Sequence, residues 1–321
     1  MHKSDLAFVF AAQVPYLAKW TLRAWVRLAH LASRPSWADH WAVEKMTETL
    51  AYRVPVWTRL GNGQKIRVAL NDWIGRRIYE HGYYEPDTVR LVEALLQKDM
   101  VVLDVGAHVG HYSLIASRLV GEGGEVHSFE PDPQTFDWLE SNARANRLRN
   151  VTLNQTAVAS DQGPRRLHFS KVRDTGSNSL VEQKDYSRSG RWCVVPCTTL
   201  DAYASANGLS RIDFIKADVE GAELGMLQGA RGILGAAEPP VLLLEFEEER
   251  QRAFGSSCAR LAEELDRYGY SLWNVDDRLE PYRPGPGDPP TLNVLAVPPS
   301  RQALVSRLAG AISREPPASR R

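Results

Sequence analysis

From Met100 onward the sequence alternates short apolar runs with amphipathic segments, and this alternation restricts the fold more than any other feature. Val101–Val105 predicts a buried parallel strand, and the apolar spacing over His111–Val120 predicts the helix that follows it. Repeated units of this kind form a parallel sheet with helices on both faces. The further elements expected are strands at 125–129, 151–153, 212–217 and 241–246, and helices around 136–143, 223–234 and 258–268.

The last two predicted strands are joined differently from the others. Ser271–Val275 and Leu292–Val297 flank a loop rich in Pro and Gly, which predicts a closing hairpin. Such a hairpin places an antiparallel strand on an otherwise parallel sheet. The predicted fold class is therefore α/β, with a Rossmann-like, mostly parallel sheet of seven strands that includes a C-terminal antiparallel strand.

The pattern also predicts how the chain is organised. We expect an N-terminal helical extension with a short strand pair (1–82), a main domain (83–300) that contains a hairpin or flap insertion (162–199), and a partly disordered tail (301–321). Within the extension, Leu17–Leu31 predicts an amphipathic helix with basic residues on one face. Such a helix can lie on an anionic membrane surface, but packing on the main domain or on a second copy of the chain is the favoured interpretation.

Charge and cysteine content restrict the partners and the compartment. Lys+Arg and Asp+Glu are equal at 39 each, so there is no electrostatic reason to expect nucleic acid. The three cysteines outline neither a disulfide framework nor a zinc site, which suits a cytoplasmic protein. No apolar run is long enough to span a bilayer, and Pro15 interrupts Leu6–Val14, the one segment that resembles the core of a signal peptide.

The strongest chemical signal is the segment D-V-G-A-H-V-G, which lies between the first predicted sheet strand and its helix. Open α/β sheets bind ligands at this edge. Gly106 and Gly110 allow a sharp turn and a close approach of the backbone to a ligand, and the free N–H groups at the helix start suit a carboxylate. We therefore expect a cofactor loop that contains Asp104, Gly106, Ala107, His108 and Gly110.

Glu130 ends the second predicted strand in F-E-P, about twenty residues after Gly110, where a ribose-binding acid is expected. Its carboxylate oxygens can accept hydrogen bonds from both ribose hydroxyls of an adenosine. Asp104 would repel the pyrophosphate of a dinucleotide, whereas S-adenosylmethionine (SAM) carries an ammonium, a carboxylate and a sulfonium. These residues favour SAM as the cofactor, and an NAD-dependent oxidoreductase is the alternative enzyme.

A second acidic cluster lies in I-K-A-D-V-E-G-A-E, at the end of the fourth predicted sheet strand. Glu220 and Glu223 stand at a helix start, where capping alone explains Glu223. Asp218 faces the crevice, so we expect it near the transferred methyl group, with Asp218 or Glu220 as the general base. Asp218 and Glu245, which ends the next strand, are candidate ligands of a divalent cation.

Together these segments make the chain resemble the FkbM family of SAM-dependent methyltransferases over about Asp72–Val297. Where this chain has K-A-D, the family usually shows K-I-D, which is a conservative change. The segments that carry the resemblance are D-W-I-G-R-R-I-Y-E-H-G-Y-Y-E-P (72–86), V-V-L-D-V-G-A-H-V-G (101–110), F-E-P (129–131), T-L-D (199–201), I-K-A-D-V-E-G-A-E (215–223) and N-V-L-A (293–296).

The resemblance implies a class I methyltransferase fold and O-methylation of a hydroxyl on a small metabolite, such as a polyketide-type compound, or on a sugar or glycan. It also implies that Tyr84 and Glu85 close over the methionine end of SAM. The family's acidic segment corresponds to Asp218, Glu220 and Glu223 of this chain. A protein that binds SAM without catalysis, and that serves a membrane or a protein partner, is the non-enzymatic alternative. The residues to which cofactor binding is carried over are Asp104, Gly106, Gly110 and Glu130.

Overall fold

The computed structural model describes residues 55–70, 72–170, 175–181, 190–276, 278–285 and 291–312. The chain divides into two compact units, Met1–Tyr84 and Glu85–Arg321. The amphipathic helix predicted near the N-terminus and the last part of the predicted tail lie outside the described residues.

The first unit contains an antiparallel strand pair, β1 (Val56–Arg59) and β2 (Lys65–Val68), followed by the helix α3 (Trp73–His81). Asp72 begins α3, because its side chain accepts a hydrogen bond from the amide of Ile74. Gly82 ends the helix in a left-handed conformation, with φ at 80°. This strand pair lies within the segment predicted as the N-terminal extension, and the helices expected before it fall outside the described part of the chain.

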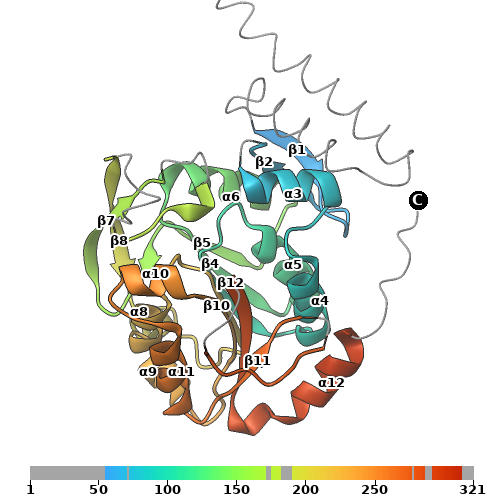
Figure 1. The fold of residues 1–321 in the computed structure, drawn as a ribbon. Helices are drawn as coiled ribbons and strands as arrows, with labels where there is room; N and C mark the ends of the chain where they lie inside the picture. Colours follow the sequence, from blue (N-terminus) through green and yellow to red (C-terminus); the bar gives the residue numbers. More distant parts are fainter. Residues whose placement is uncertain are drawn as a thin grey trace, which may run out of the picture. The chain divides into compact units, whose positions relative to one another are not determined.

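The second unit is built on a sheet of seven strands in the order β11-β12-β10-β9-β3-β4-β5 (Figure 1). Its central strands run parallel, whereas β12 is antiparallel to both of its neighbours. The predicted Rossmann-like fold, with one C-terminal antiparallel strand, is confirmed. The strands are β3 (Val101–Val105), β4 (Glu125–Phe129), β5 (Val151–Asn154), β9 (Phe214–Ala217), β10 (Val241–Glu247), β11 (Ser271–Asn274) and β12 (Thr291–Val297).

Helices cover this sheet, with α4, α5 and α12 on one side and α8, α9 and α11 on the other (Figure 1). The core between the layers is apolar, and Leu103, Ile215 and Leu242 are fully buried in it. These residues come from the consecutive strands β3, β9 and β10. The helices of this unit are α4 (Pro86–Leu95), α5 (His111–Val120), α6 (Pro133–Ala145), α7 (Leu200–Ala206), α8 (Glu223–Gln228), α9 (Arg231–Leu234), α10 (Glu248–Ala253), α11 (Cys258–Asp266) and α12 (Ala303–Ile312).

The single helix predicted over 223–234 is two helices, α8 and α9, and this part of the prediction is wrong. The interruption falls at Gly229, whose carbonyl oxygen accepts a hydrogen bond from the amide of Asp201. A Cβ atom at Gly229 would lie 2.4 Å from the carbonyl oxygen of Ala159. The break therefore follows from a close approach between backbones that are distant in the sequence, which helical periodicity does not reveal.

The segment expected as a C-terminal tail contains structure at its start. A short 3₁₀ turn at Pro299–Arg301 leads into α12, which packs against α4. Leu308 is fully buried and Val305 is nearly so, and apolar burial of this kind is what stabilises a helix of this length. Residues 313–321, where disorder was expected, lie outside the described residues.

A second sheet has three strands in the order β6 (Ala157–Val158), β8 (Trp192–Thr198) and β7 (Gly163–His168). β7 and β8 lie within the segment predicted as an insertion, 162–199, whereas β6 precedes it. β7 and β8 pair as an antiparallel ladder, and a 3₁₀ turn, η1 (Thr175–Ser177), belongs to the connection between them. The small core of this sheet is formed by Ala157, Ala159, Leu167, Val195 and Cys197.

The described cysteines are all free thiols. Among the helices of the described ranges, none combines the length and the apolar character needed to cross a bilayer.

Candidate functional site

The predicted cofactor loop turns sharply between β3 and α5. The amides of Gly106 and Ala107 both donate to the carbonyl oxygen of Phe129, at 3.0 and 2.9 Å, so the loop bends over the end of β4. Gly106 and Gly110 have φ angles of 81° and 89°, a region that favours glycine. The N-cap residue of α5 is Gly110, so no side chain caps the helix, which begins at the crevice edge of the sheet.

Gly106 is required for a second reason, since a Cβ atom there would lie 1.8 Å from the carbonyl oxygen of Asp218. We predict that Gly106→Ala lowers the free energy of unfolding by roughly 3 kcal/mol or more, because the left-handed backbone and a backbone collision both oppose the methyl group. Gly208→Ala, two residues after the end of α7, is the matched control: its φ is 67°, but nothing lies within 4 Å of the added carbon. It should cost only about 1 kcal/mol in urea denaturation, and equal losses for the two variants would contradict the assignment.

Glu130 is nearly buried at the end of β4, with 7% of its surface exposed. Its Oε2 accepts a hydrogen bond from the amide of His108 and its Oε1 accepts one from the amide of Asp132, both at 2.9 Å. Burial raises the pKa of Glu130 to about 8. Each oxygen retains a second lone pair, so the carboxylate both shapes the loop and keeps acceptor capacity for a ligand.

Asp104 lies at the carboxyl end of β3 with 1% of its surface exposed. Its Oδ2 accepts a hydrogen bond from the Ser113 hydroxyl at 2.5 Å. Burial raises the pKa of Asp104. Its Oδ1 is buried and has no hydrogen-bond partner among the described residues. A buried acceptor of this kind usually meets a partner in the working protein, and an ammonium group on a ligand would supply one.

Lys216 is a site residue that the sequence reasoning missed. Only 5% of its surface is exposed, and its Nζ lies 3.2 Å from Oδ2 of Asp218 and 4.8 Å from the ring centre of Tyr112. The charges of Asp218, Asp104 and Glu85 raise the pKa of Lys216 against the effect of burial. A strand alternates its faces, so Lys216 and Asp218, two positions apart, share one side. That period of two is the signal that could have identified the pair.

Asp218 and Glu245 lie beside each other, since Ala217 pairs with Leu244 in parallel register. Burial alone would raise the pKa of Asp218, but Lys216 holds it below its usual value. Burial and then the charge of Asp218 raise the pKa of Glu245 well above its usual value. Burial and the charge of Asp218 therefore favour the protonated form of Glu245, whereas Lys216 favours the ionised form of Asp218.

These charges bear on the predicted divalent cation. Of the two candidate ligands, Asp218 is already paired with the Lys216 ammonium, and burial together with the charge of Asp218 disfavours the ionised form of Glu245. Within the described part of the chain, no group of three or more His, Cys, Asp or Glu side chains is arranged to hold a metal ion. The donor set does not fit a divalent cation, which prefers several ionised oxygen ligands.

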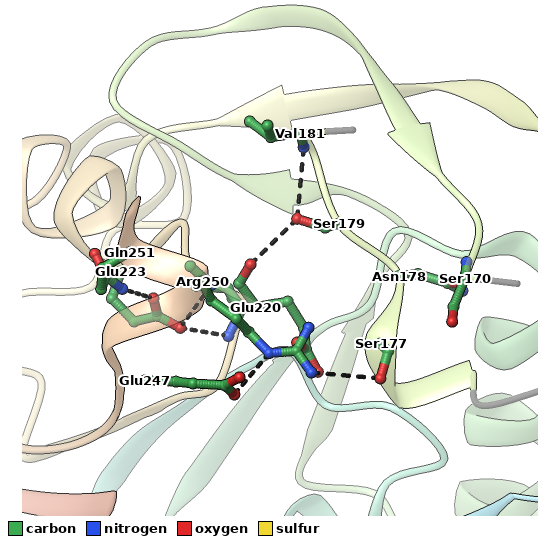
Figure 2. Close-up of polar contacts among 12 residues, drawn as sticks. Ser170, Ser177, Asn178, Ser179, Val181, Glu220, Glu223, Glu247, Arg250 and Gln251 are labelled. Carbon is green, nitrogen blue, oxygen red and sulfur yellow. Dashed lines mark hydrogen bonds and ion pairs between the residues drawn. The ribbon is translucent and has the colours of Figure 1, made fainter. Parts of the chain in front are cut away.

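The other two acids of the acidic segment serve the backbone around them. Glu223 accepts hydrogen bonds from the amide of Val219 through Oε1 at 2.9 Å and from the side chain of Gln251 through Oε2 at 2.5 Å. Burial raises the pKa of Glu223 to about 7. Glu220 forms an ion pair with Arg250 (Figure 2).

Glu85 connects three elements of the second unit. Its Oε2 accepts a hydrogen bond from the Tyr112 hydroxyl and its Oε1 accepts one from Asn293 Nδ2, both at 2.9 Å. The charge of Lys216 also acts on it, although burial raises the pKa of Glu85 overall. Tyr84 belongs to the first unit, and its role over the cofactor stays a prediction.

His111 begins α5 and is buried, with 4% of its surface exposed. Burial lowers its pKa to about 3. Its imidazole is therefore neutral at physiological pH and does not titrate in the range where a histidine base works best.

Residues 104–272 match the model of the methyltransferase FkbM domain. Among curated relatives, the hexuronic acid methyltransferase AglP of Haloferax volcanii is 25% identical over 150 residues, which cover 47% of this chain and 58% of that protein. The 2-O-methyltransferase NoeI of Sinorhizobium fredii is 28% identical over 159 residues, covering 45% of this chain and 63% of that protein. The chain thus spans about three fifths of the length of these relatives.

Among solved structures, the methyltransferase FkbM of Methylobacillus flagellatus is 15% identical to this chain, with a TM-score of 0.40. The match covers 64% of this chain and 48% of that one.

Proposed function

Because the chain belongs to the FkbM family of methyltransferases, we propose that it transfers the methyl group of SAM to a hydroxyl oxygen on a small metabolite, a sugar or a glycan. The observation that carries this proposal is the meeting of three strand ends, where the 104–110 loop, Glu130 and the Lys216–Asp218 pair come together. Parallel α/β sheets bind their ligands at this edge.

The residues at this edge suit the groups of SAM. Glu130 would accept from the ribose hydroxyls, and the buried, unpaired Oδ1 of Asp104 would accept from the ammonium. The uncapped first turn of α5 would receive the carboxylate. When bound, SAM would supply a methyl group on a positively charged sulfur, and the acceptor oxygen would bond to the methyl carbon as the sulfur leaves as a neutral thioether.

Asp218 is the residue that we assign to the acceptor hydroxyl. Its side chain is 28% exposed, so an acceptor can reach it, and Lys216 keeps it ionised. An ionised carboxylate can orient a hydroxyl and take its proton as the oxygen loses electron density to the methyl carbon. Glu220 is less suited to this role because its carboxylate is held by Arg250.

The printed names of the two relatives direct the choice of acceptors. One acts on a hexuronic acid, and the other is a 2-O-methyltransferase. We therefore propose sugars with free hydroxyls as the first acceptors to screen, including hexuronic acids and glycosides with a free 2-hydroxyl. Transfer of labelled methyl from SAM to any of them would separate an enzyme from a protein that only binds SAM.

Calorimetric titration of the purified protein with SAM, and separately with NADH, tests the choice of cofactor. We expect SAM to bind with a micromolar dissociation constant and NADH not to bind, because the acidic side chain of Asp104, near the end of β3, would oppose the negative charge of a pyrophosphate in the adjoining loop. Binding of NADH without SAM would replace the proposal by the oxidoreductase alternative. Binding of neither would leave the family assignment without a cofactor-dependent activity.

A further inference from the structure

The acidic loop, which we define as Asp218–Ala222, has an unusual backbone. Glu220 has a φ of 59° and Gly221 a φ of 101°, so two successive residues lie in left-handed conformations. A Cβ atom at Gly221 would lie 2.7 Å from the carbonyl oxygen of Arg250. A residue such as Glu220 stays in this region only where the surrounding structure holds it.

Arg250, on α10, lies against this loop with 10% of its side chain exposed. Figure 2 shows its guanidinium among groups from three different segments. It forms an ion pair with Glu220, its Nε donates to Glu247 Oε2 at 2.7 Å, and its Nη2 donates to the Ser177 hydroxyl at 3.4 Å. A planar guanidinium can satisfy several acceptors in fixed directions, which a single ammonium cannot do.

Ser177 belongs to a bridging segment, residues 175–181, that contacts both sides of the site. The Ser179 hydroxyl donates to the carbonyl oxygen of Glu220 at 3.1 Å. Asn178 Nδ2 donates to Asp132 Oδ2 at 2.8 Å, and the amide of Asp132 in turn donates to Glu130. The bridging segment therefore links the acid expected to hold the ribose with the acidic loop.

The acidic loop also touches the cofactor loop directly. The amide of Asp218 donates to the carbonyl oxygen of Val105 at 3.1 Å. The carbonyl oxygen of Asp218 faces Gly106 so closely that only a glycine fits there. A shift of the acidic loop would therefore move the Gly106 turn and change the contacts that this turn makes with a bound cofactor.

We propose that Arg250 is a positioning residue, which holds the acidic loop in its left-handed conformation and joins it to the bridging segment. Glu220 then affects cofactor binding through its ion pair with this guanidinium. The proposal rests on SAM being the cofactor. Without the guanidinium, the carboxylates of Glu220 and Glu247 would lie together, mostly buried and without the cation between them. The loop would then relax, and the cofactor loop would lose the geometry that Gly106 requires.

A double-mutant cycle on SAM binding tests this proposal without any knowledge of the acceptor. We expect Arg250→Gln and Glu220→Gln each to weaken SAM binding about tenfold in calorimetric titration, and the double variant to be no weaker than the weaker single one. Arg252→Gln is the matched control. Arg252 lies on the same helix in an exposed pair with Glu248, and its loss should change the dissociation constant less than twofold.

A purely structural role predicts another pattern. If both single variants lowered the melting temperature but bound SAM within twofold of wild type, or if their effects on binding simply added, the proposal would be overturned. If Arg250→Gln does not fold, Glu220→Gln and Ser179→Ala decide the matter, since each removes one contact of the loop and keeps the guanidinium. Failure of the wild type to bind SAM would instead overturn the proposed function, and the two failures are therefore distinguishable.

Discussion

Replacement of Glu130 by alanine is expected to weaken SAM binding at least about a hundredfold. At pH 9, above the Glu130 pKa of about 8, a hydrogen bond to this charged acceptor contributes about 1.5–3 kcal/mol, and two ribose hydroxyls would lose the acceptor together. The loop would also lose the two amide contacts, from His108 and Asp132, that the carboxylate holds at 2.9 Å. Calorimetric titration with SAM measures the loss, and Glu140→Ala, an exposed acid paired with Arg144 on α6, is the control expected to bind normally.

The pH dependence of the same measurement separates the charge of Glu130 from its shape. Since burial raises the pKa of Glu130 to about 8, the carboxyl of the free protein is mostly protonated at pH 7 and ionised at pH 9. Hydroxyl donors favour the ionised form, so the affinity of the wild type should rise across this range. Glu130→Gln should not show this rise. The amino group of SAM also titrates, and the profile of Glu130→Gln measures this contribution separately. Parallel profiles for the two proteins would remove Glu130 from the ribose site.

Asp218→Asn is expected to lower the rate of methyl transfer by a factor of about 10² to 10⁴, the usual contribution of a positioned base. The amide keeps the size of the side chain but neither accepts the hydroxyl proton nor balances Lys216, whose Nζ lies 3.2 Å away. Single-turnover transfer of labelled methyl to the best acceptor of the sugar screen measures the effect. Binding of SAM should change less than tenfold, because the ribose and methionine contacts remain.

Two outcomes would remove Asp218 from the chemistry. One is a variant that keeps most of its turnover. The other is a wild-type activity that EDTA abolishes and added Mg²⁺ restores. The charges around Asp218 and Glu245 leave no suitable set of ligands for a cation, so a required metal ion would bind elsewhere and would activate the acceptor hydroxyl in place of Asp218.

Most of the main sheet could be predicted because each of its strands coincides with a short apolar run in the sequence. The strand Glu125–Phe129 and the helix His111–Val120 have the bounds that the spacing indicated. What could not be predicted depends on distant contacts. The break at Gly229 arises from the backbone at Ala159, and α12 depends on burial against α4.

The site shows the same division between local and distant information. The loop at Gly106 and the acid at Glu130 follow from sequence spacing alone, because a turn and a strand end are local features. Lys216 was within reach of the same reasoning, through the period of two that it shares with Asp218. Arg250 was not, since nothing in its own surroundings indicates that it would meet Glu220 from a neighbouring strand end.

The antiparallel strand β12 has a consequence for the order in which the protein can be made. It lies between β10 and β11, and Asn293 on it donates to Glu85, 208 positions earlier in the chain. On the ribosome, β10 therefore emerges with an unpaired edge, and Glu85 emerges without its amide partner. SAM should find its finished site only once β12 has been released and inserted, so that cofactor capture reports the completion of the seven-stranded sheet.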